Sequence, residues 1–394
     1  MRKTHRAFVR GGMNATEAAE LHESGIVAVD IVATSSDERC FVTRSEPINV
    51  FAPTMNLNEY FQAGLGLNSR FVLVDTHTGS VLSPARLQAC ALLGREGFRQ
   101  SLPVNVKPVA WARARFNSIP YFLCESVAEM DALATSLQGD DQKVFFRGQT
   151  TDYTIQRTAS VRRFLYGDDR VRETSLPSTA FRTNFDYSAT EPVIEIVFGD
   201  VLFRLTGKTS RTHWVEDEIE MVCVSVSDGG IAARRSATTM ALAQHYGIPT
   251  YGLDVTRSVR FAWWFATHTF DTSTGGYMPL IVDPHVPLHS RPVMYVFRSQ
   301  HSVELRDLDL FATRPQAQEA VFVHGSWGLH GNVCAEDLIA ILILGGDIGV
   351  CDEPLDRLFP KPSEDPVYQQ LLALKLSLTE EPFRSVLAHV YEVH

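Results

Sequence analysis

The chain has 394 residues, more than one compact core usually holds, so we expect two domains. Hydrophobic residues make up 45% and charged residues 21%, which are ordinary globular proportions and exclude wholesale disorder. The formal net charge of −10 argues against binding a polyanion through bulk electrostatics. A local excess of arginine over residues 147–182 has two interpretations, a basic groove or, more simply, a solvated surface of mixed charge.

Targeting and metal-binding features are missing from the sequence. The six cysteines are widely spaced with no CxxC pair, so we expect neither a disulfide framework nor a zinc site. The basic start is not followed by the apolar segment of a signal peptide, and the longest apolar run, residues 338–344, is too short to span a bilayer. His285 and His289 lie among prolines that keep them off one helix face. We therefore expect a cytoplasmic protein with no bound metal and no membrane contact.

The first 115 residues show no repeat and no motif. β-rich runs at 26–32 and 70–74 predict strands, and an apolar pattern near helical spacing over 84–102 predicts a helix. We interpret residues 1–115 as an N-terminal α+β region of undefined role.

From residue 116 the pattern is sharper. Ser126 can cap a helix that has Glu129 at the capping-box position. Periodicity predicts further helices over 191–205, 237–246, 258–269, 354–358 and 367–376. Strands are predicted over 143–147, 293–297, 319–323 and 339–344, with a strand or turn over 250–255. Residues 116–380 are thus predicted to form an α+β domain, a mixed sheet with flanking helices, followed by a C-terminal tail over 381–394.

Common nucleotide-binding and catalytic signatures are absent. There is no GxxxxGK[ST], no GxGxxG between a strand and a helix, and no GxSxG. A function in nucleotide chemistry must therefore rest on other residues.

Three separated segments carry a resemblance instead. They are Phe146-Arg147-Gly148-Gln149, residues 241–250 (Ala-Leu-Ala-Gln-His-Tyr-Gly-Ile-Pro-Thr) with 253–258 after them, and residues 314–322. Together with the Leu-Phe-Pro sequence at 358–360, they resemble the FRG domain, a family named for its Phe-Arg-Gly sequence. The chain departs from the family at 251–255, where Tyr-Gly-Leu-Asp-Val replaces the common Arg-Leu-Leu-Asp-Trp, and at Ala320, where glycine is common.

The residues of the first two segments have chemistry suited to a nucleotide. Arg147, followed by Gly148, presents a guanidinium fork at a strand end where backbone and phosphate can come close. His245 and Tyr246 lie at a helix end, and they supply an imidazole and a ring that can stack on a base. The alternatives are structural: an ion pair for Arg147 and a backbone hydrogen bond for His245.

The next predicted helix begins at Ser258, shortly after Asp254 and Thr256, and the amides at a helix N-terminus favour anions. The three residues are candidate cofactor-binding groups. The structural alternative is that Asp254 or Thr256 only caps that helix.

A weaker resemblance is to the arginine, serine and glutamate motifs of ADP-ribosyltransferases. It implies that Arg147 holds the pyrophosphate of NAD and that Thr256 and Ser258 support the nicotinamide ribose. It also implies that Glu319, beside Gln318, stabilises the positive charge of the transition state. The register differs from that family, because Gln318 stands where its motif has glutamate. The resemblance leaves an ADP-ribosyltransferase-like core as an expectation for the fold.

The resemblances imply an ADP-ribosyltransferase-like toxin or phage-defence effector that uses NAD. A protein or nucleic acid would be its acceptor, and an antitoxin or regulatory protein a partner. Two alternatives stay open: a non-catalytic sensor that binds a nucleotide or nucleic acid, and a nucleotide or RNA hydrolase with His245 as general base. We expect Arg147, His245, Asp254 and Gln318 to meet at one site, with His245, Gln318 and Glu319 as catalytic residues.

Overall fold

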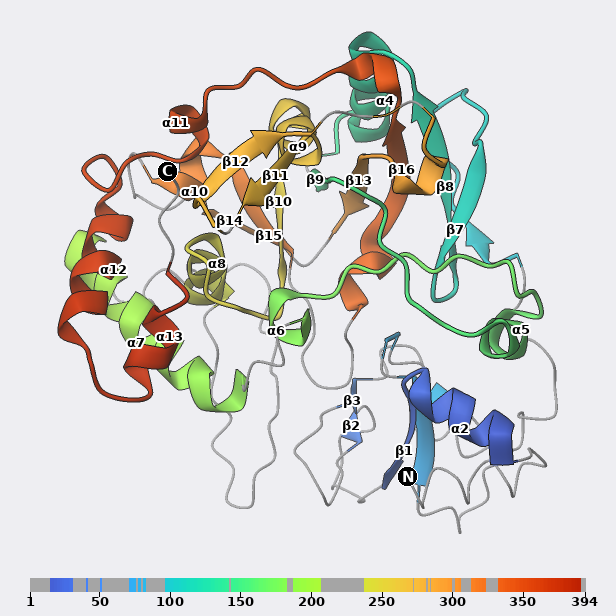
Figure 1. Cartoon of the computed structure of the whole chain (residues 1–394), viewed down its shortest axis with the longest axis horizontal. Helices are drawn as coiled ribbons and strands as arrows, with labels where there is room; N and C mark the ends of the chain where they lie inside the picture. Colours follow the sequence, from blue (N-terminus) through green and yellow to red (C-terminus); the bar gives the residue numbers. More distant parts are fainter. Residues whose placement is uncertain are drawn as a thin grey trace.

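The computed structural model describes residues 15–30, 40–41, 50–51, 71–75, 77–78, 81–82, 96–141, 143–182, 187–206, 237–271, 273–280, 283, 285–299, 302–305, 313–323 and 332–390. A nine-stranded sheet dominates them (Figure 1). The strands run in the order β14-β15-β10-β9-β13-β16-β8-β6, and β7 also pairs with β8. β8 is parallel to β16 and to β6, and the other pairs are antiparallel. The predicted α+β class with a mixed sheet is confirmed.

The strands of this sheet come from distant parts of the chain. Their bounds are β6 (Phe98–Arg99), β7 (Ala110–Ala114), β8 (Asn117–Cys124), β9 (Val144–Gln149), β10 (Leu253–Thr256), β13 (Val293–Arg298), β14 (Ser302–Glu304), β15 (Ala320–Val323) and β16 (Leu338–Leu344). The predicted boundary after residue 115 falls inside the β7–β8 hairpin, where Arg115 adopts a φ of 53°. The sheet therefore begins before that boundary.

Both faces of the sheet are covered. Phe146, Met294 and Leu342 pack on one face with the helices α4 (Val127–Gln138) and α9 (Val259–Ala266). Phe145, Tyr295 and Ile341 pack on the other face, which the short helix η5 (Val333–Asp337) helps to cover. A strand buried on both faces has no polar alternation, which explains the continuous apolar run of β16.

A second core lies in a group of helices beside the sheet (Figure 1). Its helices are α7 (Tyr187–Thr206), α8 (Ala237–His245), α12 (Pro366–Ser377) and α13 (Phe383–Leu387). The prediction of a C-terminal tail over 381–394 is wrong for the described residues up to 390. Val386, Leu387 and Val390 are buried in this core, and their apolar side chains fix the chain end on α7 and α12.

Most predicted elements are present with small shifts at their ends. Ser126 caps α4 by accepting a hydrogen bond from the Glu129 amide, as predicted. The helix predicted over 258–269 ends at Ala266, because the chain turns at Thr267 into the hairpin of β11 (His268–Asp271) and β12 (Gly276–Pro279). Of the helix predicted over 84–102, residues 84–95 lie outside the described residues, and Phe98–Arg99 pairs with β8 as a strand instead.

The smaller elements lie around this sheet. The N-terminal part contains α2 (Ala15–Glu23) and a sheet of β1 (Ile26–Asp30), β4 (Phe71–Asp75) and β5 (Val81–Leu82), which confirms strands in both runs predicted before residue 75. It also contains the pair of β2 (Cys40–Phe41) and β3 (Val50–Phe51). The remaining helices are α5 (Ala159–Tyr166), α6 (Thr179–Arg182), η3 (Leu288–Ser290), α10 (Arg314–Ala317), η6 (Gly346–Ile348) and α11 (Leu355–Leu358).

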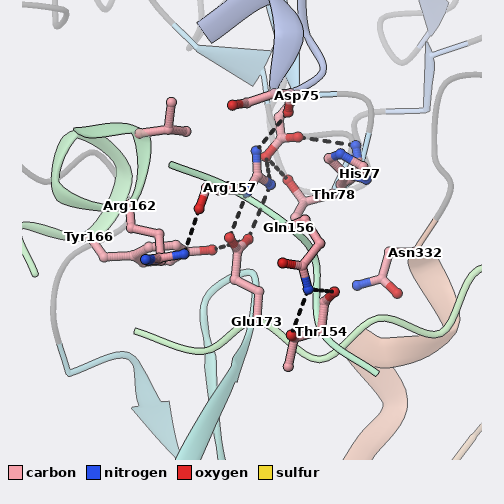
Figure 2. Close-up of polar contacts among 12 residues, drawn as sticks. Asp75, His77, Thr78, Thr154, Gln156, Arg157, Arg162, Tyr166, Glu173 and Asn332 are labelled. Carbon is pink, nitrogen blue, oxygen red and sulfur yellow. Dashed lines mark hydrogen bonds and ion pairs between the residues drawn. The ribbon is translucent and has the colours of Figure 1, made fainter. Parts of the chain in front are cut away.

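One buried arginine joins the N-terminal part to the rest of the protein (Figure 2). Arg157 Nη2 donates to Asp75 Oδ2 at 2.8 Å, and Arg157 Nε donates to Glu173 Oε2 at 2.5 Å. The Tyr166 hydroxyl completes the shell of Glu173 at 2.6 Å, and the carbonyl of Ser24 accepts from Arg157 Nη1 at 3.3 Å. All three charged side chains are excluded from water. The end of β4 is thus fixed beside α5 by ionic contacts.

The two carboxylates share one guanidinium, but their pKa values shift in opposite directions. Burial raises the pKa of Glu173, and the charge of Arg157 opposes this only in part. Burial alone would also raise the pKa of Asp75, but the charges of Arg157 and His77 bring this pKa below its ordinary value. Asp75 also accepts from the His77 amide and the Thr78 hydroxyl. The two buried carboxylates therefore depend on Arg157 for a compensating positive charge.

Replacement of Arg157 by methionine tests this joint. Arg157→Met keeps a long apolar side chain but leaves two buried carboxylates without their cation, so we expect a loss of about 3–5 kcal/mol in the free energy of unfolding. Urea unfolding followed by circular dichroism measures it. Arg170→Ala is the matched control, because Arg170 is exposed and pairs with Asp168 at the surface, and it should change stability by no more than about 0.5 kcal/mol. Equal stabilities of the two variants would contradict the buried joint.

Candidate functional site

Three of the four residues predicted to share a site, Arg147, His245 and Asp254, are in contact. Arg147 in β9 donates from Nη1 to the backbone carbonyl of Asp254 in the neighbouring strand β10. His245, the last residue of α8, places Nε2 at 3.3 Å from Asp254 Oδ1. Gln318, the fourth predicted residue, lies in the turn before β15, where its side-chain amide donates to the Leu358 carbonyl at 3.0 Å. We call Arg147, Arg182, His245 and Asp254 the Arg147 cluster.

Local sequence explains how Arg147 and Gly148 are placed. Successive residues of β9 face opposite sides of the sheet, so Arg147 and Gly148 point apart. A Cβ atom at Gly148 would lie 1.7 Å from the carbonyl oxygen of Ala262, so only glycine lets α9 pack onto β9. The close approach predicted at Gly148 is therefore to a helix backbone.

His245 is held at the end of its helix. Gly247, with a φ of 97°, ends α8 in the left-handed region that suits glycine. The carbonyl of His245 is free of the helix and accepts from Arg314 Nη1 at 3.1 Å. The imidazole is left to face Asp254, with the residue 94% buried.

Buried polar atoms without a hydrogen bond gather in this cluster. Among the described residues, Arg147 Nε, His245 Nε2 and Asp254 Oδ1 have no hydrogen-bond partner, and neither does Gln149 Oε1 two residues along β9. His245 Nε2 and Asp254 Oδ1 lie 3.3 Å apart, but the two groups are not aligned for a hydrogen bond. Folded proteins leave few such atoms, and a group of them indicates a place for water or a ligand.

The charges of the cluster act on one another. Burial lowers the pKa of His245, Asp254 acts in the opposite direction, and the positive charges of Arg314 and Arg147 add to the lowering. His245 is therefore a neutral imidazole at pH 7, able to donate from one nitrogen and accept at the other.

Arg182, at the end of α6, belongs to the same charge group. The pKa of Arg182 is lowered by loss of water around the guanidinium and by the charge of Arg147, while Asp254 and Tyr153 raise it. Sequence reasoning did not single out Arg182. Its only signal there was the arginine excess over 147–182.

Tyr246, predicted as a stacking group, lies in the core. Its hydroxyl donates to Asp365 at 2.8 Å, and its ring stacks on Tyr368 with centroids 6.0 Å apart. The ring is fully buried, so it presents no surface to a ligand. Asp365, which the sequence analysis missed, also caps α12 and accepts from the Arg314 amide at 2.8 Å.

Thr256 and Ser258 support the backbone around α9. The Thr256 hydroxyl donates to the Gln318 carbonyl at 2.8 Å and accepts from the Ser258 amide at 3.0 Å. Ser258 caps α9 by accepting from the Phe261 amide at 3.3 Å. Both hydroxyls thus have structural contacts, and the cap of α9 is Ser258 instead of Asp254 or Thr256, which the structural alternative named.

Glu319 is exposed and lies in a turn. Its φ of 47° places it in the left-handed region, and β15 begins one residue later, at Ala320. Its carbonyl accepts from the Arg257 amide at 3.2 Å, while its side chain faces solvent. The carboxylate that faces His245 is that of Asp254.

The cluster is suited to an anionic ligand, since it holds two guanidinium groups, a neutral imidazole and one carboxylate. Within the described part of the chain, no three His, Cys, Asp or Glu side chains are arranged to hold a metal ion. No helix of that part has the length and apolar character needed to cross a bilayer.

Comparison with known proteins identifies one family. The family model of the FRG domain matches residues 142–274, a segment that contains all four residues of the Arg147 cluster. The strands β8, β13, β15 and β16 of the same sheet lie outside the matched segment. No curated protein and no solved structure matches the chain.

The buried His245 predicts a specific pH dependence. Its folded pKa lies below the unfolded value of about 6.5, so the unfolded chain takes up a proton first and stability falls as the pH drops below that value. His245→Gln removes this proton uptake. Urea unfolding at pH 7 and pH 5 should therefore show a larger loss in the wild type than in the variant. Identical losses would contradict a buried, neutral His245.

Proposed function

We propose that this FRG-domain protein binds NAD, or another nucleotide with a pyrophosphate, at the Arg147 cluster and transfers ADP-ribose from it. The observation that carries the proposal is that Arg147, His245 and Asp254 each have a buried polar atom without a hydrogen bond, while Arg147 contacts the Asp254 carbonyl and His245 faces the Asp254 carboxylate. They come from a strand, a helix end and the next strand, so one ligand could satisfy all three.

Arg147 has the properties of a phosphate-binding residue. One of its nitrogens is fixed on the Asp254 carbonyl, which orients the guanidinium while Nε stays without a partner among the described residues. An oriented guanidinium binds phosphate oxygens through charge-assisted hydrogen bonds with little loss of side-chain freedom. The side chain is half-buried, which strengthens such bonds relative to a fully solvated arginine.

Asp254 supplies the carboxylate that the transfer needs. Cleavage of the bond between the ribose and nicotinamide leaves its electron pair on nicotinamide and positive charge on the ribose, until an acceptor nucleophile forms the new bond. A carboxylate beside the ribose stabilises that charge. The proposal gives this role to Asp254 in place of Glu319, with neutral His245 bonded to a ribose hydroxyl. The acceptor would be a protein or nucleic acid, as for a toxin or phage-defence effector.

The exposed side chain of Glu319 favours a second candidate, a sensor that binds the nucleotide without turning it over. Such a protein needs the anion-binding residues of the cluster and no carboxylate beside the ribose. Binding and turnover therefore have to be measured separately.

The binding experiment is calorimetric titration of NAD into the wild type and Arg147→Ala. We expect affinity to fall about tenfold or more, because the variant loses charge-assisted hydrogen bonds. Arg204→Ala removes an equal charge from the exposed face of α7 and should bind like the wild type. Circular dichroism confirms that each variant is folded. Equal affinity of a folded Arg147→Ala protein would remove Arg147 from the site.

The turnover experiment compares two isosteric substitutions, Asp254→Asn and Glu319→Gln. Nicotinamide release, followed by mass spectrometry, should fall on the order of a hundredfold or more in Asp254→Asn and stay within about twofold in Glu319→Gln. The opposite pattern would return the catalytic role to Glu319. A wild type that binds NAD but releases no nicotinamide, with candidate acceptors present, would support the sensor.

A further inference from the structure

The two edges of strand β9 are paired to different extents. All six residues of the strand are in register with β13, but β10 is paired with it only between Phe146 and Thr256. Beyond this pair, the side chain of Arg147 crosses to β10 and donates to the Asp254 carbonyl. Among the described strands, the end of β9 from Arg147 to Gln149 is thus paired with β13 alone.

Gln149 lies on the same side of the sheet as Arg147. Side chains alternate along a strand, so residues two apart face the same way, with their Cα atoms about 6.6 Å apart. Gly148, between them, faces the other side, where α9 packs against it. The register with β13 agrees, because Arg147 is opposite Tyr295, Gln149 is opposite Val293, and both partners belong to one core.

The two side chains have complementary atoms without partners. Arg147 Nε, a donor, and Gln149 Oε1, an acceptor, are both buried and have no hydrogen bond among the described residues. A ligand that supplies the missing partners gains the free energy of both hydrogen bonds. The pyrophosphate of a dinucleotide satisfies Arg147 Nε, but its oxygens carry no proton to donate to Gln149 Oε1. The acceptor therefore requires a second group on the ligand, one with an O–H or N–H bond.

We infer that Gln149 Oε1 accepts a hydrogen bond from a hydroxyl of the adenosine ribose, which makes the site selective for ribonucleotides over deoxyribonucleotides. The inference rests on the proposed binding of a nucleotide at the Arg147 cluster, which places the other ribose of NAD beside Asp254 and His245. In such a ligand the ribose hydroxyls are the donors nearest to the 5′ phosphate, and the amino group of the base lies beyond the ribose. The short step along β9 from Arg147 to Gln149 therefore suits a hydroxyl better than the base.

Calorimetric titrations of the wild type and Gln149→Met test this assignment. Methionine keeps the length of the side chain and removes its hydrogen-bonding atoms. The ligands are ADP, its 2′-deoxy and 3′-deoxy analogues, and inosine diphosphate, which lacks the amino group of adenine. The wild type should bind one deoxy analogue about ten- to a hundredfold more weakly than ADP, and inosine diphosphate as well as ADP. Gln149→Met should bind ADP and that analogue within about twofold of each other, because the discriminating acceptor is gone.

A matched variant controls for the substitution itself. Gln369→Met makes the same change at an exposed position of α12 and should keep the wild-type affinities for all the ligands. Circular dichroism shows whether each variant is folded. The comparison of ligands on the wild type needs no variant, so it tests the inference even where Gln149→Met does not fold.

The outcomes distinguish this inference from the proposed function. A wild type that binds ADP and both deoxy analogues equally, or a folded Gln149→Met that keeps the discrimination, overturns the role of Gln149. A preference for ADP over inosine diphosphate that disappears in Gln149→Met would assign Gln149 to the base and overturn the ribose contact. NAD binding that depends on Arg147 but not on Gln149 overturns the inference alone. A wild type that binds neither NAD nor ADP overturns the proposed function, and the inference with it.

Discussion

The candidate site depends on a single hydrogen bond, from the guanidinium of Arg147 to the backbone carbonyl of Asp254. An arginine beside an aspartate usually pairs with its carboxylate, which would close the site as an ion pair. Here the carbonyl takes one nitrogen, and Oδ1 of the carboxylate has no hydrogen bond among the described residues. The guanidinium of Arg147 thus contacts the backbone at Asp254, while Oδ1 of the Asp254 carboxylate faces His245. That arrangement is costly in a partly buried place and is typical of sites that bind ligands.

The rest of the fold keeps this arrangement in place. β9 and β10 are neighbours in a sheet covered on both faces, and the missing side chain at Gly148 lets α9 lie directly on β9. His245 reaches Asp254 because α8 ends there, and α6 is held beside them by Gln244. Groups on element ends, supported by a packed scaffold, can be held with the precision that recognition requires.

The ionic joint at Arg157 extends this scaffold to the N-terminal region. A buried cation shared by two carboxylates is destabilising when any member is removed, so the contact between β4 and α5 is specific in its geometry. Nothing in the sequence marks Asp75 and Glu173 as partners, because they lie 82 and 16 positions from Arg157 and in unremarkable surroundings. The described residues at the end of β4, in a region that carries no motif, are thereby joined to the FRG domain.

Local sequence patterns predicted the helices, strands and caps, whereas most features that depend on contacts between residues far apart in the sequence were not predicted. The apolar run of β16 and the cap at Ser126 are local, and both were found as predicted. The meeting of Arg147, His245 and Asp254 followed from the order of the motifs. The burial of Tyr246 did not, since it depends on Asp365, 119 positions away. Arg182 was missed for the same reason, because it donates to Thr179, which is bound by Gln244 65 positions away.

A crystal structure of the protein with ADP-ribose bound would test the central claim most directly. The account predicts a phosphate oxygen within about 3.2 Å of Arg147 Nε, with the ribose next to Asp254 and His245. The ligand would then satisfy the buried atoms that have no hydrogen bond in the protein alone. ADP-ribose bound elsewhere, with Arg147 Nε still lacking a partner, would contradict the account.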